Sequence, residues 1–343
     1  MGLAKRGTAI HTYAACLLCA LACAAGEALS GDERLGPGTH ALTLRVSGHE
    51  RSYIVHVPRR YDSRAAVPLV VMLHGGGGTA RGAMWETGWA EKAEREGFLA
   101  AFPDALARDP ARPSSFAANP QLWNDGSGRF YPGQEAVDDV GFIGAMLDDL
   151  SARFAVDARR VFVTGFSNGA SMSFRVGAEL AHRIAAIAPV AGALWIEPGA
   201  LKPPVSMCYL TGSADPLNLI EGGVPRLASG ASDRVRAKPK PPVRESVAKW
   251  VKALGCPASP ASESSANGVI TRTYCAGVHG ASADVHGARA DVIYIVVEGL
   301  GHTWAGGRSL LPERMVGKTS DRIRATDVIW EFFQRHGRVR VQP

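Results

Sequence analysis

The sequence lacks several motifs that identify common functional classes. After residue 25 it contains only three cysteines, none of them in a Cys-x-x-Cys pair, and it contains no His-Glu-x-x-His motif. The glycine-rich segment at residues 75–78 is not followed by Gly-Lys-Ser or Gly-Lys-Thr, as a phosphate-binding loop would be. No repeat of about 20–50 residues is visible, which argues against a solenoid or a propeller. We therefore expect no metal site and no organic cofactor.

Positively charged residues only slightly outnumber negatively charged ones. The chain has 38 lysines and arginines against 32 aspartates and glutamates, a formal net charge of +6. The one basic cluster is interleaved with prolines and contains no aromatic residue: Arg234, Arg236, Lys238, Lys240 and Arg244. Such a pattern favours a solvated loop over a nucleic-acid surface, so no nucleic-acid partner is expected.

No apolar run is long enough to cross a membrane. A bilayer requires about 20 consecutive apolar residues, whereas the apolar run near the N-terminus covers only residues 13–25 and follows Lys5 and Arg6. A short apolar core after positive charges is typical of a secretory signal. The sequence thus predicts a signal peptide over residues 1–25.

The end of this segment allows two kinds of processing. Ala22-Cys23-Ala24 offers small residues for cleavage. The stretch Ala20-Leu21-Ala22 before Cys23 also resembles a bacterial lipoprotein site, so a lipid anchor at Cys23 is the alternative. Both interpretations predict an exported protein, extracellular or periplasmic, without a membrane span.

Cysteine is scarce outside this leader. Of six cysteines, three lie in the predicted signal peptide: Cys16, Cys19 and Cys23. Cys256 and Cys275 bracket a polar loop, which suits a disulfide in an oxidising compartment. Cys208 lies within the apolar run 205–210 and is expected to be a buried free thiol.

The remaining chain has the composition and pattern of a globular α/β domain. It is 46% hydrophobic, enough for a large core. After a β-hairpin at residues 39–58, predicted strands alternate with predicted helices, which favours a mostly parallel sheet with helices on both faces. The strands are residues 67–73, 98–102, 161–164, 184–188, 205–210 and 292–297. The helices are residues 83–96, 138–154, a segment from 170, 243–254 and 326–336. Nothing requires a domain boundary within residues 26–343.

Two long irregular segments interrupt this alternation, at residues 105–137 and 216–242. Loops of such length are usually functional lids or disordered. Trp123 in the first segment and Trp304 near the C-terminus are candidate substrate-binding residues. With Phe130 and Tyr131 they either line a cleft or form part of the core.

The central motif is Gly165-Phe-Ser-Asn-Gly169, which occurs once. It follows the strand-like residues 161–164 and precedes a helix-compatible segment. In this context a Gly-x-Ser-x-Gly pentapeptide forms a sharp turn that exposes the serine hydroxyl near a helix N-terminus. Ser167 is therefore the candidate nucleophile; the alternative is an ordinary Ser-Gly turn.

A nucleophilic serine requires a base and an acid that orients it, and in this fold the acid and then the histidine follow the serine. Asp215 lies in a glycine-containing turn after the strand 205–210, although it could serve only that turn. Among the histidines after Ser167, only His302 follows a strong strand, 292–297. Asp215 and His302 are the candidates.

An oxyanion hole requires two N–H donors near the serine. The Asn168 N–H lies at the expected helix start, and the glycine-rich loop at residues 74–78 offers a second donor, for which Gly76 is the candidate. The alternative for this loop is a flexible turn, and His74 is expected to brace it.

Together these motifs resemble the secreted poly(3-hydroxybutyrate) depolymerase and feruloyl-esterase-like family. The resemblance covers residues 39–336 and is carried by Leu73-His-Gly-Gly-Gly-Gly78, Val137-Asp-Asp-Val-Gly-Phe-Ile143, Val156-Asp-x-Arg-Arg-Val161, Gly165-Phe-Ser-Asn-Gly169 and Gly301-His-Thr-Trp304. It implies an α/β-hydrolase fold with a Ser-Asp-His triad at Ser167, Asp215 and His302, and a cysteine pair near Cys256 and Cys275. Ala305 departs from the family pattern, where proline is usual.

The expected function is that of a serine carboxylester hydrolase with an acyl-enzyme intermediate. The resemblance implies an ester substrate, either a hydroxyalkanoate oligomer or a polysaccharide carrying feruloyl or acetyl groups. A serine peptidase and a binding protein with vestigial activity are the alternatives. The complete set of Ser167, Asp215 and His302 argues against the binding protein, because binding alone would not require all three.

Overall fold

The computed structural model describes residues 35–225, 233–275 and 290–338. The predicted signal peptide and Cys23 lie outside these residues and remain predictions. Among the helices of the described ranges, none combines the length and the apolar character needed to cross a bilayer.

A ten-stranded sheet with the order β1-β2-β4-β3-β5-β6-β7-β10-β9-β8 forms the centre of the fold. Its middle is parallel and consists of β4 (Leu99–Pro103), β3 (Val67–Leu73), β5 (Val156–Phe166), β6 (Ala186–Val190), β7 (Ser206–Gly212) and β10 (Val292–Val297). These strands are apolar along most of their length because both faces of the sheet are covered. The predicted sheet is confirmed.

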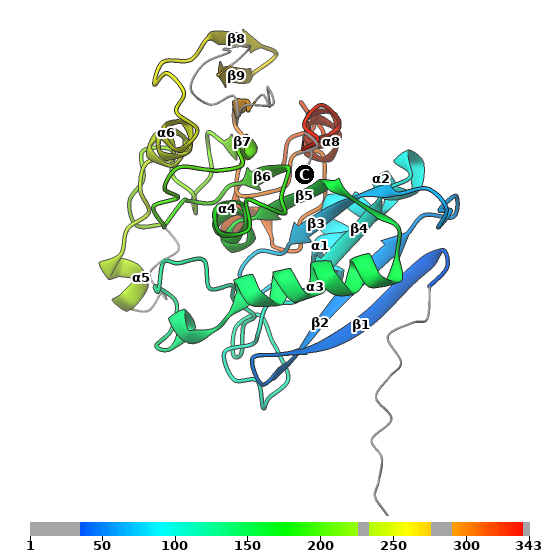
Figure 1. Cartoon of the computed structure of the whole chain (residues 1–343). Coiled ribbons are helices and arrows are strands. Elements are labelled where there is room, and N and C mark those ends of the chain that lie inside the picture. The colour runs from blue at the N-terminus through cyan, green and yellow to red at the C-terminus, as the bar shows by residue number, and fades with distance from the viewer. Residues whose placement is uncertain (1–34, 226–232, 276–289, 339–343) are drawn as a thin grey trace, which may run out of the picture.

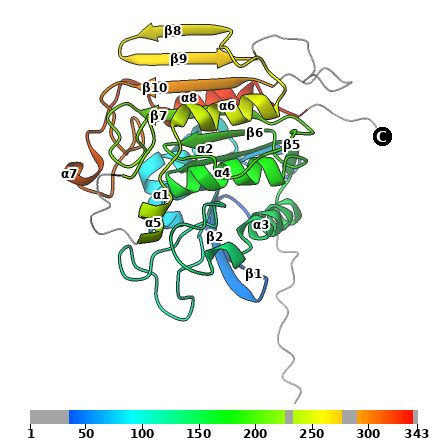
Figure 2. The same ribbon diagram turned by 90° about the vertical axis from the view of Figure 1, so that its left-hand side faces the viewer.

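Antiparallel strands complete both edges of the sheet (Figure 2). One edge is the hairpin β1 (Gly38–Val46) and β2 (His49–Val57), and the other is the hairpin β9 (Val269–Tyr274) and β8 (Ser262–Ala266). The first hairpin was expected from its alternating pattern.

Helices cover both faces of the sheet (Figure 1). One layer contains α3 (Asp139–Arg153), α4 (Asn168–Glu179) and α6 (Val243–Ala253), and the other contains α1 (Ala80–Thr87), α2 (Trp89–Glu96) and α8 (Ala325–Gln334). Three short helices lie in the loops: η1 (Gln134–Ala136), α5 (Asp233–Ala237) and α7 (Glu313–Val316). The expected α/β architecture is therefore present.

Aromatic packing fixes β5 against the helix layer on one face of the sheet and α4 within the layer on the other. Phe162 on β5 stacks on Phe333 of α8 with ring centroids 4.6 Å apart. On the other face, Phe174 of α4 packs against Trp250 of α6 at 5.7 Å. Burial of such rings contributes several kcal/mol to stability, so the strand and the helix that flank Ser167 have little freedom to move.

Two expectations about secondary structure were wrong. The helix predicted over residues 83–96 is interrupted at Gly88, whose φ of 67° ends α1 and starts α2. The polar loop predicted between Cys256 and Cys275 contains the hairpin β8–β9. Its strands are exposed or only partly buried, so they show no apolar alternation. The signal for this hairpin was Asn267-Gly268, because both residues have the positive φ of a tight hairpin turn.

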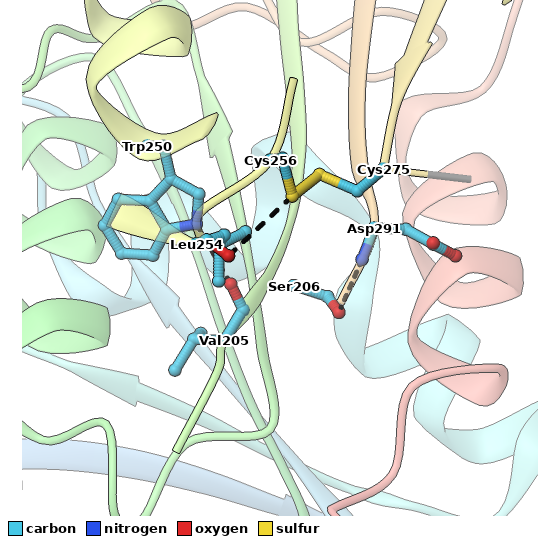
Figure 3. Close-up of a disulfide and its surroundings, with 7 residues drawn as sticks. All are labelled: Val205, Ser206, Trp250, Leu254, Cys256, Cys275 and Asp291. Carbon is cyan, nitrogen blue, oxygen red and sulfur yellow. Dashed lines mark hydrogen bonds between the residues drawn. A yellow bond between two sulfur atoms is a disulfide. The ribbon is translucent and has the colours of Figure 1, made fainter. Parts of the chain in front are cut away.

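The predicted disulfide between Cys256 and Cys275 is present (Figure 3), with the Cα atoms 5.5 Å apart. It joins the residues after α6 to the end of β9, so the edge hairpin is fastened to the helical layer. Nearby, the Trp250 indole donates to the Val205 carbonyl (3.0 Å), which fixes α6 against the start of β7. Cys208 is a buried free thiol, as expected.

Replacing both Cys256 and Cys275 by alanine should lower the free energy of unfolding by about 3 kcal/mol, because a cross-link over a loop of this length restricts the unfolded chain. Chemical denaturation measures the change. Wild type in reductant should approach the double variant, and reductant should leave the double variant unaffected. Equal stability of oxidised wild type and double variant would contradict a stabilising role.

Candidate active site

Ser167 lies at the sharp turn between β5 and α4, in the geometry that the Gly-x-Ser-x-Gly motif predicts. Its φ of 56° and ψ of −115° are unusual for a residue with a side chain. Such backbone strain costs about 1–3 kcal/mol and persists only where the surroundings impose it. Here the Ser167 N–H donates to the Val190 carbonyl (2.9 Å), and the Ser167 carbonyl accepts from the Ser171 N–H (3.1 Å).

The two glycines of the motif let three segments of backbone meet. A Cβ built on Gly165 would lie 2.2 Å from the Gly169 carbonyl oxygen. A Cβ built on Gly169 would lie 2.2 Å from the carbonyl oxygen of Leu73, at the end of β3. No side chain fits at either position, so glycine is required for the close approach of strand and helix.

The structure brings the three predicted side chains together from three loops. His302 Nε2 lies 2.8 Å from Ser167 Oγ, and His302 Nδ1 lies 2.7 Å from Asp215 Oδ2. Asp215 and His302 are 3% and 5% exposed, so these hydrogen bonds are largely shielded from water. The geometry matches a histidine that donates through Nδ1 to the carboxylate and accepts the serine proton at Nε2.

The Asp215 carboxylate is held as an anion. Its second oxygen accepts from the N–H groups of Leu217 and Asn218, both at 2.7 Å. Burial by itself raises its pKa, but the charge and hydrogen bond of His302, with Lys240 and the Asn218 N–H, outweigh burial and hold the pKa below its usual value. The carboxylate therefore stays charged at neutral pH.

The glycine-rich loop after β3 lies against the serine turn. Cβ atoms built on Gly75 and Gly76 would each lie 3.5 Å from a Cβ of the turn, that of Ser167 and that of Asn168 respectively. Neither the Gly76 N–H nor the Asn168 N–H has an acceptor among the described residues. Two free donors beside the hydroxyl are what an oxyanion hole requires.

His74 braces this loop. Its Nε2 accepts from the Ala105 N–H (3.0 Å), so Nδ1 carries the proton and donates to the Gly75 carbonyl (2.7 Å). Burial lowers the pKa of His74, which keeps the ring neutral. The imidazole thereby ties the loop to the residues after β4.

Trp123 and Trp304 are placed in the interior, 0% and 2% exposed. The Trp123 indole donates to the His74 carbonyl (3.0 Å), and the Trp304 indole donates to Thr326 Oγ1 (2.9 Å). Neither side chain lines the cavity beside Ser167. Of the two interpretations given for these aromatic residues, the structure favours the core, where they support the loops that carry the site.

Sequence reasoning assigned a role only to the backbone of Asn168, but its side chain also organises the site. Its Oδ1 accepts from the Trp123 N–H (2.8 Å), and its Nδ2 donates to Asp125 Oδ2 (2.9 Å) and to the Trp123 carbonyl (3.2 Å). Asp125 is only 2% exposed. This amide fastens the irregular segment at residues 105–137 to the N-terminus of α4.

A cavity of about 320 Å³ opens beside Ser167. Its wall combines the serine turn and the glycine loop with residues from both irregular segments and from the loop after β6. The residues that sequence reasoning missed are Phe116, Pro120, Leu122, Asp125, Arg129, Ser171, Trp195, Leu217, Pro225 and Lys240, whereas Phe130 had been proposed for a cleft. They come from segments far apart in the sequence, so no local pattern groups them.

The basic cluster was expected to be a solvated loop, and this was only partly right. Arg234 and Arg236 are exposed on α5. Lys240 is partly buried in the cavity wall, where its Nζ donates to Asn218 Oδ1 (3.0 Å).

In the described part of the chain, no group of three or more histidine, cysteine, aspartate and glutamate side chains is arranged to hold a metal ion.

Comparison with known families agrees with this geometry. Residues 51–231, more than half of the chain, match the family described as Esterase PHB depolymerase. The chain belongs to this family. With its mostly parallel sheet and its esterase relatives, it is a carboxylic ester hydrolase of the α/β-hydrolase fold.

Individual relatives carry related names. The chain is 30% identical over 86% of its length to "Putative esterase NocK" of Nocardia uniformis subsp. tsuyamanensis, of which it spans 82%. It is 28% identical over 66% of its length to Feruloyl esterase B of Piromyces equi, of which it spans 40%. The acetyl xylan esterase structure from Aspergillus awamori superposes with a TM-score of 0.52 at 18% identity, over 77% of this chain and 94% of that one. That structural match concerns the fold alone.

Gly169→Ala should destabilise the protein by about 3 kcal/mol or more, because the new methyl group meets backbone atoms that cannot move away. Gly144→Ala is the matched control, since Gly144 also lies in a helix but has no atom near a built Cβ. That control should gain about 0.5–1 kcal/mol from the higher helix propensity of alanine. Chemical denaturation of both variants decides, and equal stabilities would contradict the tight crossing.

Asn168→Asp should destabilise the protein by about 3 kcal/mol at neutral pH, because it places a second buried carboxylate beside Asp125. Burial already raises the pKa of Asp125. A raised carboxyl pKa means that stability is lost as pH rises and regained as pH falls, so the deficit should shrink between pH 7 and pH 5. The exposed Asn267→Asp serves as the control for denaturation measured across this range. A deficit independent of pH would argue against the proximity.

Proposed function

We propose that this chain is an exported serine carboxylester hydrolase that works through an acyl-enzyme. Ser167 is the nucleophile, His302 the general base and acid, and Asp215 the residue that orients His302. One observation carries the proposal: the hydrogen-bonded line from Ser167 Oγ to His302 (2.8 Å) and on to Asp215 (2.7 Å).

The reaction follows from this geometry. As Ser167 Oγ attacks the ester carbonyl, its proton passes to His302 Nε2, and the Asp215 carboxylate stabilises the imidazolium that forms. The imidazolium then protonates the leaving alkoxide, and an acyl-enzyme remains. Water activated by the same histidine attacks the acyl-enzyme, which releases the acid and restores Ser167.

The negative charge of each tetrahedral intermediate would be stabilised by the N–H groups of Gly76 and Asn168. Both donors belong to backbone that the glycine crossing holds in place, so they need little rearrangement during the reaction. Loss of one such donor typically costs about 3–4 kcal/mol of transition-state stabilisation. The N-terminal end of α4 adds a favourable dipole at the same point.

For the substrate we propose a short hydroxyalkanoate oligomer first, and a feruloyl or acetyl ester of a plant polysaccharide as the alternative. The family description supports the first, and the name of the feruloyl esterase relative supports the second. The predicted signal at residues 1–25 supports export, to the periplasm or the cell exterior.

Two other functions stay open to test. A serine peptidase would use the same three side chains but would turn over an amide bond. A binding protein would keep its biological function after Ser167→Ala. Neither has a supporting feature in the described structure, whereas the esterase assignment agrees with the family.

Ser167→Ala and His302→Ala should each reduce ester turnover by about 10³-fold or more, because each removes a group on which bond making depends. Asp215→Asn should reduce kcat by about 10³–10⁴-fold through loss of the histidine orientation. The assay compares 4-nitrophenyl butyrate, methyl ferulate, acetylated xylan and 3-hydroxybutyrate oligomers. The best substrate distinguishes the polyester from the plant-wall hypothesis.

Far-UV circular dichroism and denaturation should show that these variants fold. Because the pKa of Asp215 is held below its usual value, the acid limb of the wild-type rate profile should not report protonation of Asp215. A Ser167→Ala protein within tenfold of wild type would refute the mechanism. Turnover of an amide but of no ester would point to the peptidase instead.

A further inference from the structure

The cavity beside Ser167 is lined by a buried cation, Arg129, two of whose N–H-bearing atoms have no hydrogen-bond partner among the described residues. Arg129 lines this cavity and is 4% exposed. Its Nε and Nη1 atoms are buried, and neither has a hydrogen-bond acceptor in the described part of the chain. The guanidinium lies over the rings of Phe130 and Trp195, with its Cζ atom 5.3 Å and 5.1 Å from their centroids. Such cation–π contacts stabilise the charge but satisfy none of the N–H donors of the guanidinium.

In the described ranges, no carboxylate forms a hydrogen bond with Arg129 Nε or Nη1. Asp125 accepts from the Ser127 N–H (3.0 Å) and from Asn168 Nδ2 (2.9 Å). Its charge attracts Arg129 through space, but among the described residues no hydrogen bond joins the two side chains. Asp215 is bound to His302 (2.7 Å). The acidic groups at the site are therefore already occupied with other donors.

A second cation lies in the same wall. Lys240 Nζ donates to the neutral Asn218 Oδ1 (3.0 Å). Burial, followed by the repulsion of Arg129, lowers the pKa of Lys240 to about 8. The cavity wall thus brings two cations together with one carboxylate, Asp125, and burial raises the pKa of that carboxyl. A buried cation that lacks hydrogen-bond acceptors is destabilised by the loss of its hydration, and a bound anion would offset that loss.

We propose that the cavity binds a carboxylate of the substrate, with Arg129 as its principal ligand and Lys240 as a second charge. This inference rests on ester hydrolysis at Ser167 and defines the substrate class as esters that carry a free carboxylate near the scissile bond. A planar guanidinium with free N–H donors is suited to such a group.

This site separates the two substrate hypotheses. A short hydroxyalkanoate oligomer ends in a carboxylate a few bonds from its last ester, whereas an acetyl or feruloyl group on a neutral sugar has none on its acyl part. A long polyester has only one such end per chain. The enzyme is therefore expected to prefer short oligomers to polymer.

The experiment uses two pairs of esters that differ only in charge. The first pair is the mono-4-nitrophenyl ester of glutaric acid and its primary amide, with the carboxylate on the acyl side. The second is the 3-hydroxybutyrate dimer and its primary amide, with the carboxylate on the alcohol side. For at least one pair, Arg129→Met should reduce the preference for the anionic ester by about tenfold or more, mainly through KM, and Arg129→Lys should retain part of it.

Arg314→Met is the control for overall charge, because Arg314 is exposed on α7 and lies outside the cavity. It should leave the preference of both pairs within about twofold of wild type, since exposed charges act weakly through solvent. If Arg314→Met and Arg129→Met reduced the preference for the anionic ester equally, the preference would come from the overall charge of the protein. The proposed carboxylate site at Arg129 would then be wrong.

If Arg129→Met does not fold, wild-type inhibition decides. 3-Hydroxybutyrate should inhibit hydrolysis of the neutral ester competitively, and 3-hydroxybutyramide should inhibit at least about tenfold more weakly. Equal inhibition, or equal turnover of both members of both pairs, would eliminate the carboxylate site. In that case, if the wild type still hydrolysed neutral esters and Ser167→Ala did not, the proposed ester hydrolysis would remain supported. If no ester at all were hydrolysed, the proposed function itself would be rejected.

Discussion

The close crossing of β5, α4 and the end of β3 is the constraint on which the site depends. Because no Cβ fits at Gly165 or Gly169, the strand end, the serine and the helix start form one tightly packed unit. The Ser167 hydroxyl and the N–H groups proposed for the oxyanion hole are then positioned by backbone, not by flexible side chains. Electrostatic stabilisation is most effective when its donors are fixed before the reaction begins.

Two buried carboxylates, Asp215 and Asp125, connect this unit to different parts of the site. Asp215 accepts two backbone N–H groups and orients His302, whereas Asp125 accepts a backbone N–H and the Asn168 side chain and so fixes the cavity wall. Asn168 therefore links two parts of the site: its backbone N–H is a donor proposed for the oxyanion hole, and its side chain holds the segment that lines the cavity. The long segment at residues 105–137 is irregular but well anchored.

The sequence was sufficient to predict the parts that depend on local pattern. Buried parallel strands appear as continuous apolar runs, and the nucleophile turn requires glycines at fixed offsets around Ser167, so both were predicted. The edge strands β8 and β9 were missed because exposed strands need no apolar alternation. The shared position of Arg129 and Lys240 was not predicted, because 111 positions separate them in the sequence. Only the folded chain places both in the wall of the cavity beside Ser167.

The composition of that wall bears on what the enzyme selects. Phe116, Phe130 and Trp195 would suit many uncharged esters, and an apolar residue in place of Arg129 would suit them better. Replacing a buried charge by a well-packed apolar side chain is often neutral or stabilising, so the packing of the fold does not by itself require a cation at this position. The carboxylate ligand that we propose would supply the opposite charge to the guanidinium, which lies over the rings of Phe130 and Trp195. Ester hydrolysis is common to the family, whereas the carboxylate site proposed at Arg129 would determine which esters this enzyme prefers.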